Sequence, residues 1–252
     1  MIRVENIDKS FEDNHVLHDV SADFEEGKIN FIIGRSGSGK SVLTKCIVGL
    51  EEVDKGRILF HDRDFTAMSH YERKEVRREI GMLFQGGALF DSLTVEENIM
   101  FPLTMFSRST RAEMLDRVNF CLERVALSGR NKLFPAELSG GMKKRVGIAR
   151  AIAMQPKYLF VDEPNSGLDP QTAIVIDNLI KEITYDYNIT TVVVSHDMNS
   201  VMEIGDNIHF VYEGKIHWSG DRKSILNSGN KELDNFVYAS EFMRIIKDKL
   251  AH

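Results

Sequence analysis

Short apolar runs alternate with stretches of helical periodicity along this chain of 252 residues, and the alternation predicts an α/β fold. Apolar and polar residues alternate over residues 2–7 and 16–24, as they do in half-buried strands. Another short strand is expected at residues 57–60. The strands that we expect to be buried are residues 28–33 (KINFII), 80–84 (IGMLF), 158–163 (YLFVDE) and 190–196 (TTVVVSH).

Helical patterns fill much of the remaining chain. The expected helices are residues 42–50, 71–79, 94–106, 110–127 and 141–154. Thr94 and Glu97 have the spacing of a capping box at the start of the third helix. Strand patterns are absent between about residues 86 and 155, so we interpret this part as a helical insertion in the α/β domain.

The last part of the chain adds a hairpin and an amphipathic segment. Residues 207–212 and 215–218 are expected to pair about a turn at Glu213 and Gly214. Residues 231–250 are amphipathic, with an apolar stripe on one face. The stripe consists of Ala239, Phe242, Met243, Ile246 and Leu250. Such a stripe packs either on its own subunit or against a second subunit, and the sequence leaves both possibilities open.

Composition and charge narrow the class of protein. Hydrophobic residues make up 42% of the chain and charged residues 28%, as in ordinary soluble domains. The net charge of −6 argues against a nucleic-acid-binding protein, so no nucleic-acid partner is expected. Cys46 and Cys121 match no disulfide or metal framework, which favours a reducing compartment. Neither a signal peptide nor a membrane-spanning run is recognisable, so a membrane role would require a partner.

Residues 34–41 (GRSGSGKS), which we call the phosphate loop, match the pattern G-x-x-x-x-G-K-[ST] between an expected strand and an expected helix. The glycines allow backbone N–H groups to surround a phosphate, and the start of the helix favours negative charge. Lys40 can reach the outer phosphates, and the Ser41 hydroxyl can hold Mg²⁺. The predicted nucleotide-binding residues here are Gly34, Arg35, Ser36, Gly37, Ser38, Gly39, Lys40, Ser41 and Val42.

Polar residues follow three other expected strands, at the sheet edge where ligands bind in α/β folds. Gln85 can hold a metal ion or a water molecule. Asp162 can hold Mg²⁺ through water, and Glu163 can act as the general base on an attacking water. His196 can contact a γ-phosphate, and the other seven of the eight histidines are expected at the surface or at sheet edges.

Residues 138–142 (LSGGM), which we call the signature segment, precede the expected helix 141–154. Ser139 is a good N-cap, and Gly140 and Gly141 would let backbone approach a ligand closely. The segment is therefore either an ordinary capped helix or a second anion site. Because one nucleotide needs one such cradle, a second suggests a site that two copies share. Phe11 could stack on an adenine ring or could be a core or edge aromatic residue.

In their order, these motifs resemble those of the ATP-binding-cassette (ABC) ATPases, and the resemblance covers roughly residues 1–225. The motifs are Walker A at 34–41, the Q-loop at Gln85, the signature at 138–142, Walker B at 158–163, the D-loop at 166–169 and the H-loop at His196. The resemblance implies a P-loop NTPase (RecA-like) core with an antiparallel β subdomain and a helical subdomain. We expect this nucleotide-binding domain at residues 1–230, its helical subdomain at about 86–155, and a helical tail at 231–252.

The resemblance also implies a head-to-tail homodimer that binds ATP and Mg²⁺ between Walker A of one copy and the signature of the other. The residues it assigns to catalysis are Lys40, Gln85, Glu163 and the switch residue His196. Those assigned to the metal are Ser41, Gln85 and Asp162. Those assigned to the nucleotide outside the phosphate loop are Phe11, Ser139, Gly140, Gly141 and Asp169, the last of which would couple the two sites. Met142 and Asn165 depart from the usual residues, but neither change removes a catalytic group.

Residues 82–99, 137–145 and 192–197 look like the lipid-transport cassettes that work with mammalian-cell-entry (MCE) proteins. That likeness implies a peripheral ATPase on the cytoplasmic face of the inner membrane, bound to a permease dimer and an MCE protein and moving phospholipid. The loop 86–90 and the helices after it would form the groove for the permease. The alternatives are the ATPase of a polar-solute or amino-acid importer and a soluble cassette ATPase without a transport role.

Overall fold

The computed structural model describes residues 1–239 and divides the chain into two compact units. Unit 1 combines Met1–Ala67 with the chain from Val194 onward, and unit 2 is Met68–Val193. Both units contain helices and strands, which confirms the predicted α/β class. Among the described residues, no helix combines the length and apolar character needed to cross a bilayer.

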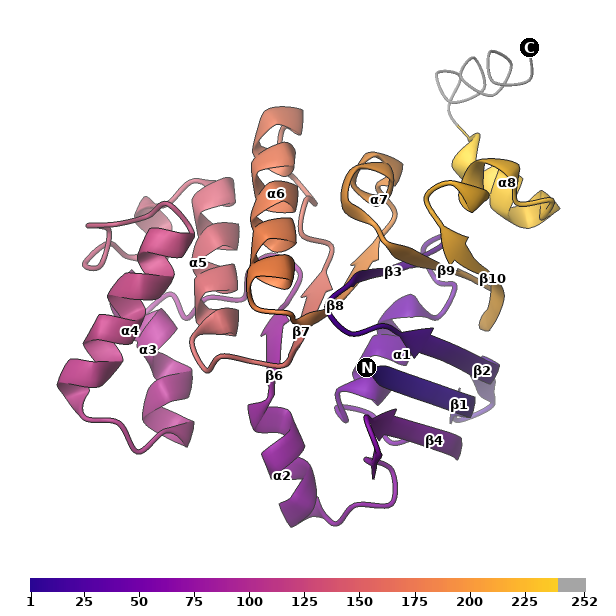
Figure 1. The fold of residues 1–252 in the computed structure, drawn as a ribbon, viewed down its shortest axis with the longest axis horizontal. Coiled ribbons are helices and arrows are strands. Elements are labelled where there is room, and N and C mark those ends of the chain that lie inside the picture. Colours follow the sequence, from indigo (N-terminus) through magenta and orange to yellow (C-terminus); the bar gives the residue numbers. More distant parts are fainter. Residues whose placement is uncertain (240–252) are drawn as a thin grey trace. The chain divides into compact units, whose positions relative to one another are not determined.

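Unit 1 contains an antiparallel sheet of strand order β2-β1-β4-β5, as the predicted fold class requires. Figure 1 shows β1, β2 and β4 side by side. The strands are β1 (Ile2–Phe11), β2 (Asn14–Phe24), β4 (Lys55–Phe60) and β5 (Arg63–Asp64). The alternation of apolar and polar residues places side chains such as Val4 and Leu17 in the core.

A second group of strands in unit 1 has the order β10-β9-β3 and supports the phosphate loop. β3 (Ile29–Ile33) runs parallel to β9 (Asn207–Tyr212), and all five of its residues are buried. β9 pairs with β10 (Lys215–Asp221) about Glu213 and Gly214, whose φ angles are 46° and 72°. The predicted hairpin is therefore confirmed. The remaining elements are α1 (Lys40–Ile47), α7 (Met198–Ile204), the 3₁₀ helix η2 (Ser224–Asn227) and α8 (Lys231–Val237).

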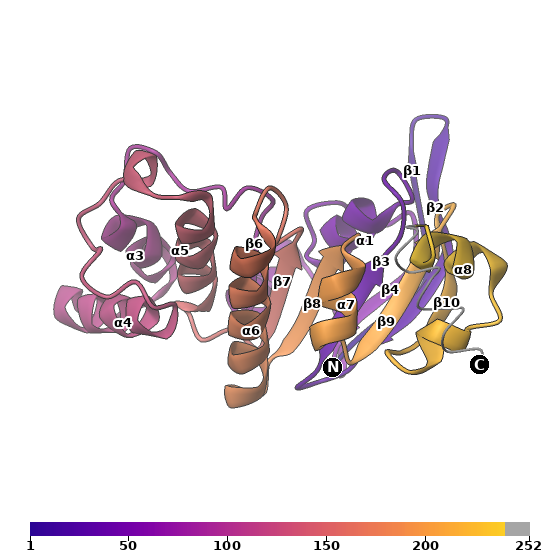
Figure 2. The same ribbon diagram turned by 90° about the horizontal axis from the view of Figure 1, so that it is seen from above.

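Unit 2 contains parallel strands and most of the helices. β6 (Ile80–Leu83) runs parallel to β7 (Tyr158–Asp162), and β8 (Thr190–Ser195) crosses the boundary between the units. Figure 2 shows α3, α4 and α5 grouped together. The helices are α2 (His70–Arg78), α3 (Val95–Phe106), α4 (Arg111–Arg124), the 3₁₀ helix η1 (Pro135–Glu137), α5 (Gly140–Ile152) and α6 (Pro170–Asp186).

Local signals explain where these helices begin. Thr94 accepts a hydrogen bond from the Glu97 backbone, and the Glu97 carboxylate accepts one in return, so the predicted capping box is present. Val118, Cys121 and Leu122 of α4 are buried, as the helical spacing predicts. Cys46 is also buried in the core, and burial raises the pKa of its thiol to about 11.

Two expectations are corrected. His209 is not at the surface but is buried on β9, where Asp23 and Ser219 contact both ring nitrogens. The helix expected from residue 231 to 250 ends at Val237, where Tyr238 leaves the helix and donates its hydroxyl to the Leu226 carbonyl at 2.7 Å. Ala239 is not helical, and Phe242, Met243, Ile246 and Leu250 lie outside the described residues.

Candidate active site

The phosphate loop follows β3 in unit 1, and its first glycine is required by space as well as by conformation. Gly34 has a φ of 149°, and a Cβ there would lie 2.3 Å from the Val211 carbonyl oxygen. Gly39 has a φ of 105° and precedes α1 as its N-cap. Since no side-chain cap occupies this helix start, the backbone N–H groups of the first turn are presented toward the loop.

Lys40 lies at the start of α1 and is only 8% exposed. Its Nζ donates to the carbonyl oxygens of Gly34 and Arg35, at 2.8 and 2.9 Å. The ammonium group is thus held inside the curve of the loop rather than in solvent. A cation in this position is suited to bind the outer phosphates of a nucleotide.

The hydroxyl of Ser38 gives a second indication of a ligand. Ser38 is 8% exposed, and its Oγ has no hydrogen-bond partner among the residues that the structure describes. Leaving a buried hydroxyl unsatisfied costs about 1–3 kcal/mol. A bound anion that accepts this hydrogen would remove the penalty, so the loop as folded fits a phosphate ligand.

The other predicted residues of the loop are open to solvent to different degrees. Arg35, Ser36 and Gly37 are exposed, and a Cβ at Gly37 would meet nothing within 4 Å. Ser41 is exposed and Val42 is half-buried on the first turn of α1. These positions leave the loop surface accessible to a nucleotide.

Two more predicted residues belong to unit 1. His196 follows the last residue of β8 and is exposed. Asp197 after it caps α7 by accepting from the Asn199 backbone at 2.9 Å. Phe11 ends β1 with 39% of its surface exposed, and Lys9 Nζ lies 4.9 Å from its ring centroid. Phe11 is therefore an accessible aromatic face and not a core residue.

In unit 2, β7 carries Asp162 at its carboxyl end and Glu163 immediately after it. Both residues are half-buried, and Glu163 has a φ of 47°. Its carbonyl oxygen accepts hydrogen bonds from Lys144 Nζ at 3.0 Å and from the Ser166 backbone at 3.3 Å. The acid pair thus stands on a sharp, well-anchored turn, which is suited to holding a general base in a fixed position.

The signature segment and Asp169 meet through one residue of α6. Ser139 caps α5 by accepting from the Met142 backbone at 3.2 Å, as predicted. Asp169 caps α6 by accepting from the Thr172 backbone at 3.0 Å and from the Thr172 hydroxyl at 2.6 Å. The Thr172 hydroxyl and backbone hold the pKa of Asp169 below its usual value. A Cβ at Gly141 would lie 2.5 Å from Thr172 Cγ2, so helix packing by itself already requires this glycine.

Gln85 is exposed just after β6, at the head of a loop that the sequence did not show to be anchored. Arg150 of α5 donates to the carbonyl oxygens of Gly87 and Ala88, both at 2.9 Å. Asn98 is fully buried and donates to the Phe90 carbonyl at 3.1 Å while accepting from its N–H at 2.9 Å. The loop after Gln85 is therefore fixed at both ends.

Lys144, Arg150 and Asn98 are functional candidates that the sequence analysis missed. Each is a polar residue on a helix face that is otherwise buried, and only Lys144 and Asn98 are themselves deeply buried. Lys144 lies three or four residues from Gly141, Gly147 and Ile148, which are buried on the same side of α5. A charge at such a core-facing position is the signal that could have identified it.

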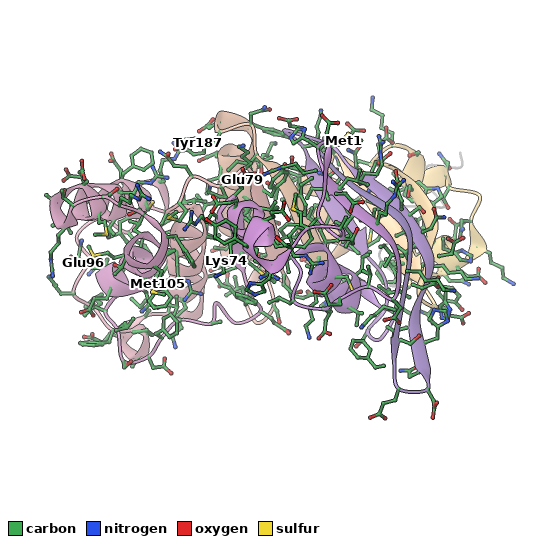
Figure 3. The ribbon with its side chains drawn as sticks, turned by 90° about the horizontal axis from the view of Figure 1, so that it is seen from below. Met1, Lys74, Glu79, Glu96, Met105 and Tyr187 are labelled. Carbon is green, nitrogen blue, oxygen red and sulfur yellow. The ribbon has the colours of Figure 1, made fainter. Side chains whose placement is uncertain are left out.

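A groove of about 320 Å³ lies in unit 2 beside this loop. Aromatic side chains line much of it, including Phe84, Phe90, Phe101 and Phe106, and Arg150 is at its wall. Phe90 and Phe101 pack with ring centroids 4.8 Å apart. Met105, which is 59% exposed, belongs to the same helix, α3, and is labelled in Figure 3.

The chemistry of these residues also fits Mg²⁺. Within residues 1–239, no group of three His, Cys, Asp or Glu side chains is arranged to hold a metal ion by itself. Mg²⁺ with nucleotides is typically held by one or two protein oxygens together with phosphates, so a hydroxyl and a single carboxylate suffice. Ser41 and His196 lie in unit 1, whereas Gln85, Asp162 and Glu163 lie in unit 2, and their convergence on one nucleotide stays a prediction.

Comparison with known proteins gives consistent matches. A family model described as ABC transporter matches residues 17–166, more than half of the chain. The methionine import ATP-binding protein MetN of Desulfitobacterium hafniense is 40% identical over 259 residues, covering 100% of this chain and 76% of that protein. The probable ribonucleotide transport ATP-binding protein mkl of Mycobacterium leprae is 36% identical over 236 residues, covering 94% of this chain and 68% of that protein.

A solved structure has a similar fold. It is an ATP-binding cassette, determined as a dimer in a post-hydrolysis state with ADP and Pi. The two chains superpose with a TM-score of 0.81 at 30% sequence identity, covering 88% of this chain and 99% of the other. The predicted fold class, a P-loop NTPase α/β fold with an antiparallel β subdomain, is thereby confirmed.

Proposed function

The chain belongs to the ABC transporter family as an ATPase subunit, and on this premise we propose that it drives a permease carrying a polar solute of the amino-acid class. The observation that supports a permease as the partner is the groove beside Gln85. Its apolar surface could bind a cytoplasmic segment of a membrane protein. The methionine import named for the Desulfitobacterium relative supports the cargo. The protein would act as a peripheral subunit on the cytoplasmic face of the inner membrane.

Phospholipid is a second candidate cargo. Residues 82–99, 137–145 and 192–197 resemble lipid-transport cassettes, and Met142 after the two glycines is typical of them. An MCE-domain protein would then be a further partner. The two relatives named above carry no lipid role in their names, so the amino-acid class stands first.

The hydrolytic roles that we propose follow the geometry of each unit. Lys40 and the phosphate loop hold the phosphates, and Phe11 contacts the adenine ring. Ser41, Gln85 and Asp162 would hold Mg²⁺, which supplies positive charge to the phosphates. Glu163 accepts the proton of the attacking water, and His196 contacts the γ-phosphate.

We assign the remaining residues to a second copy of the chain. Ser139, Gly140 and Gly141 at the start of α5 would contact the γ-phosphate of the nucleotide that the opposite phosphate loop holds. Asp169 would couple the two sites. The dimer named for the similar cassette structure supports this arrangement. ATP would close the dimer, hydrolysis would reopen it, and the groove would pass the motion to the permease.

Copurification from native membranes tests the permease partner. The chain is isolated in mild detergent, and proteins and lipids are identified by mass spectrometry. A permease with a solute receptor supports the amino-acid class, and a permease with an MCE protein and phospholipid supports the second candidate. Absence of any membrane protein would contradict both transport proposals.

Two matched variants tie the partner to the groove. Phe101 lies in the groove and is 40% exposed, whereas Phe120 on α4 lies outside it and is 37% exposed. Phe101→Ser should lower the recovered permease about 10-fold or more, because a buried aromatic contact of an interface is worth roughly 2 kcal/mol. Phe120→Ser should leave recovery unchanged. Equal recovery with both variants would exclude the groove as the binding site.

A further inference from the structure

Lys144 is a buried cation that no proposed step of ATP hydrolysis uses. It lies one turn into α5, counted from Gly140, and is only 4% exposed. Removing an ammonium group from water costs several kcal/mol unless partners replace the lost hydration. Its Nζ donates to the backbone carbonyl of Glu163 at 3.0 Å. The buried ammonium group of Lys144 is thus hydrogen-bonded to the backbone of Glu163, the proposed general base.

The backbone at Glu163 needs such support. Its φ of 47° is in the left-handed region, which costs a residue with a side chain roughly 1–3 kcal/mol. A conformation of this kind persists only when the surroundings fix it. The Ser166 backbone, which donates to the same carbonyl at 3.3 Å, closes the turn from within, whereas Lys144 holds it from α5.

A second tie secures the far part of the same loop. Asn165 Nδ2 donates to Asp177 Oδ1 at 2.8 Å, and Asp177 of α6 is 4% exposed. The loop after β7 is therefore fastened to α5 at Glu163 and to α6 at Asn165. Only the first of these ties reaches the residue that carries the base.

Two carboxylates partly offset the effect of burial on the Lys144 amine, whose pKa is lowered. Burial lowers the pKa of its amine, and the carboxylates of Asp162 and Glu163 raise it. Asp162 ends β7 and Glu163 follows it, so both acids belong to the segment that the bond from Lys144 anchors.

We propose that Lys144 is a positioning residue for ATP hydrolysis, which fixes the backbone of Glu163 and joins the base to the helix that begins at the signature segment. The inference rests on the proposed role of Glu163. Because Ser139 caps the same helix five residues earlier, a displacement of α5 at the dimer contact would reach the base through this bond. Hydrolysis would then depend on how the partner copy engages the signature segment.

The test uses steady-state hydrolysis and ATP binding of the full chain. Lys144→Met should lower kcat about 10- to 100-fold, since small displacements of a catalytic group have effects of this size. The KM and the Kd for ATP should change less than about twofold, because Lys144 lies outside the phosphate loop. Lys144→Arg, which keeps a donor and the charge, should restore most of the activity. Lys143→Met, on the neighbouring half-buried residue, is the matched control and should behave as wild type.

A double variant and the controls decide the inference. In the Glu163→Gln background, Lys144→Met should cause no further loss of turnover, because both changes disable the same step. Unchanged kcat in Lys144→Met, or an equal fall in Lys143→Met, would overturn it. A fall in kcat that parallels a lower unfolding midpoint, without rescue by arginine, would instead assign a structural role. If Glu163→Gln itself retains wild-type turnover, the proposed base is wrong, and that failure is visible without any Lys144 variant.

Discussion

Among single residues, His209 of unit 1 shows how burial changes the pKa of a side chain. It is 6% exposed and packs its ring against Phe24 at a centroid distance of 5.0 Å. The Asp23 carbonyl can only accept, so Nε2–H donates to it at 3.1 Å and the Ser219 hydroxyl donates to Nδ1 at 2.9 Å. Burial lowers the pKa of His209 to about 4 from its ordinary value of 6.5, although the Asp23 carbonyl opposes the change.

This histidine should make the stability of the protein depend on pH. The unfolded chain binds the proton below about pH 6.5 and the folded chain only below about pH 4, so stability is lost as pH falls through this interval. Between pH 8 and pH 5 the loss should be about 2 kcal/mol. Urea unfolding at the two pH values measures it. His209→Gln, which cannot titrate, should remove most of the difference, and an equally steep dependence in that variant would exclude His209 as the cause.

The role of a residue was predictable from the sequence where its hydrogen-bond partner is a near neighbour in the chain. It was not predictable where the residue is buried among distant segments. Ser139 caps its helix through a bond to a residue three positions away, and the spacing is visible in the sequence. His209 and Lys144 acquire their environments from strands and turns remote in sequence, Asp23 being 186 residues from His209. Sequence alone therefore placed His209 wrongly and left Lys144 unnoticed.

At the scale of elements, the contact between β6 and α5 depends on a glycine. A Cβ at Gly81 would lie 2.3 Å from the Ala151 carbonyl oxygen and 3.0 Å from Pro156 Cγ. Because a helix backbone cannot move aside cheaply, the strand and helix would have to separate. Gly147, on the helix side, is different, since the nearest atom to its Cβ would be the flexible end of Leu83, at 2.5 Å from Cδ1, and the Gly87 backbone would lie at an ordinary 3.5 Å.

Alanine substitutions at Gly81 and Gly147 should destabilise the protein to different extents. Gly81→Ala should lower the free energy of unfolding by about 1–3 kcal/mol, as overpacking of a core does. Gly147→Ala should cost less, because Leu83 can change rotamer and alanine favours the helix by roughly 1 kcal/mol over glycine. Denaturant midpoints followed by circular dichroism measure both. A larger loss for Gly147→Ala than for Gly81→Ala would show that the approach of Gly81 to the Ala151 carbonyl is not the tighter constraint.

Helices and strands with a clear hydrophobic pattern were predicted close to their observed positions. Their ends were predicted less accurately. The buried strand expected at 158–163 is β7, Tyr158–Asp162, because continuous apolar runs have few alternatives in a parallel sheet. In the tail, α8 ends at Val237, where Tyr238 bonds to Leu226, and the apolar residues from Phe242 onward lie outside the described part of the chain. A tertiary hydrogen bond of this kind leaves no periodic signal.

At the scale of the whole molecule, the sequence motifs predict one nucleotide site from residues of both units, and their convergence stays a prediction. The phosphate loop belongs to unit 1, between β3 and α1, and the acid pair belongs to unit 2, at the end of β7. The side chains that anchor the loop after Gln85 were not predictable from the sequence. Arg150 and Asn98 donate to backbone carbonyl oxygens, which every residue type has, so no sequence pattern marks their partners. Which solute the transporter carries is likewise not encoded in groups that bind ATP.

Hydrolysis of ATP by the wild-type chain and by Glu163→Gln tests the central claim most directly. The substitution keeps the shape of the side chain and removes the carboxylate that accepts the proton. Turnover should fall about 10²–10⁴-fold, while equilibrium binding of ATP, measured on the same preparations, should be retained because the phosphate loop is intact. Hydrolysis by Glu163→Gln at the wild-type rate would contradict the assignment of the base and, with it, the proposed mechanism of the site.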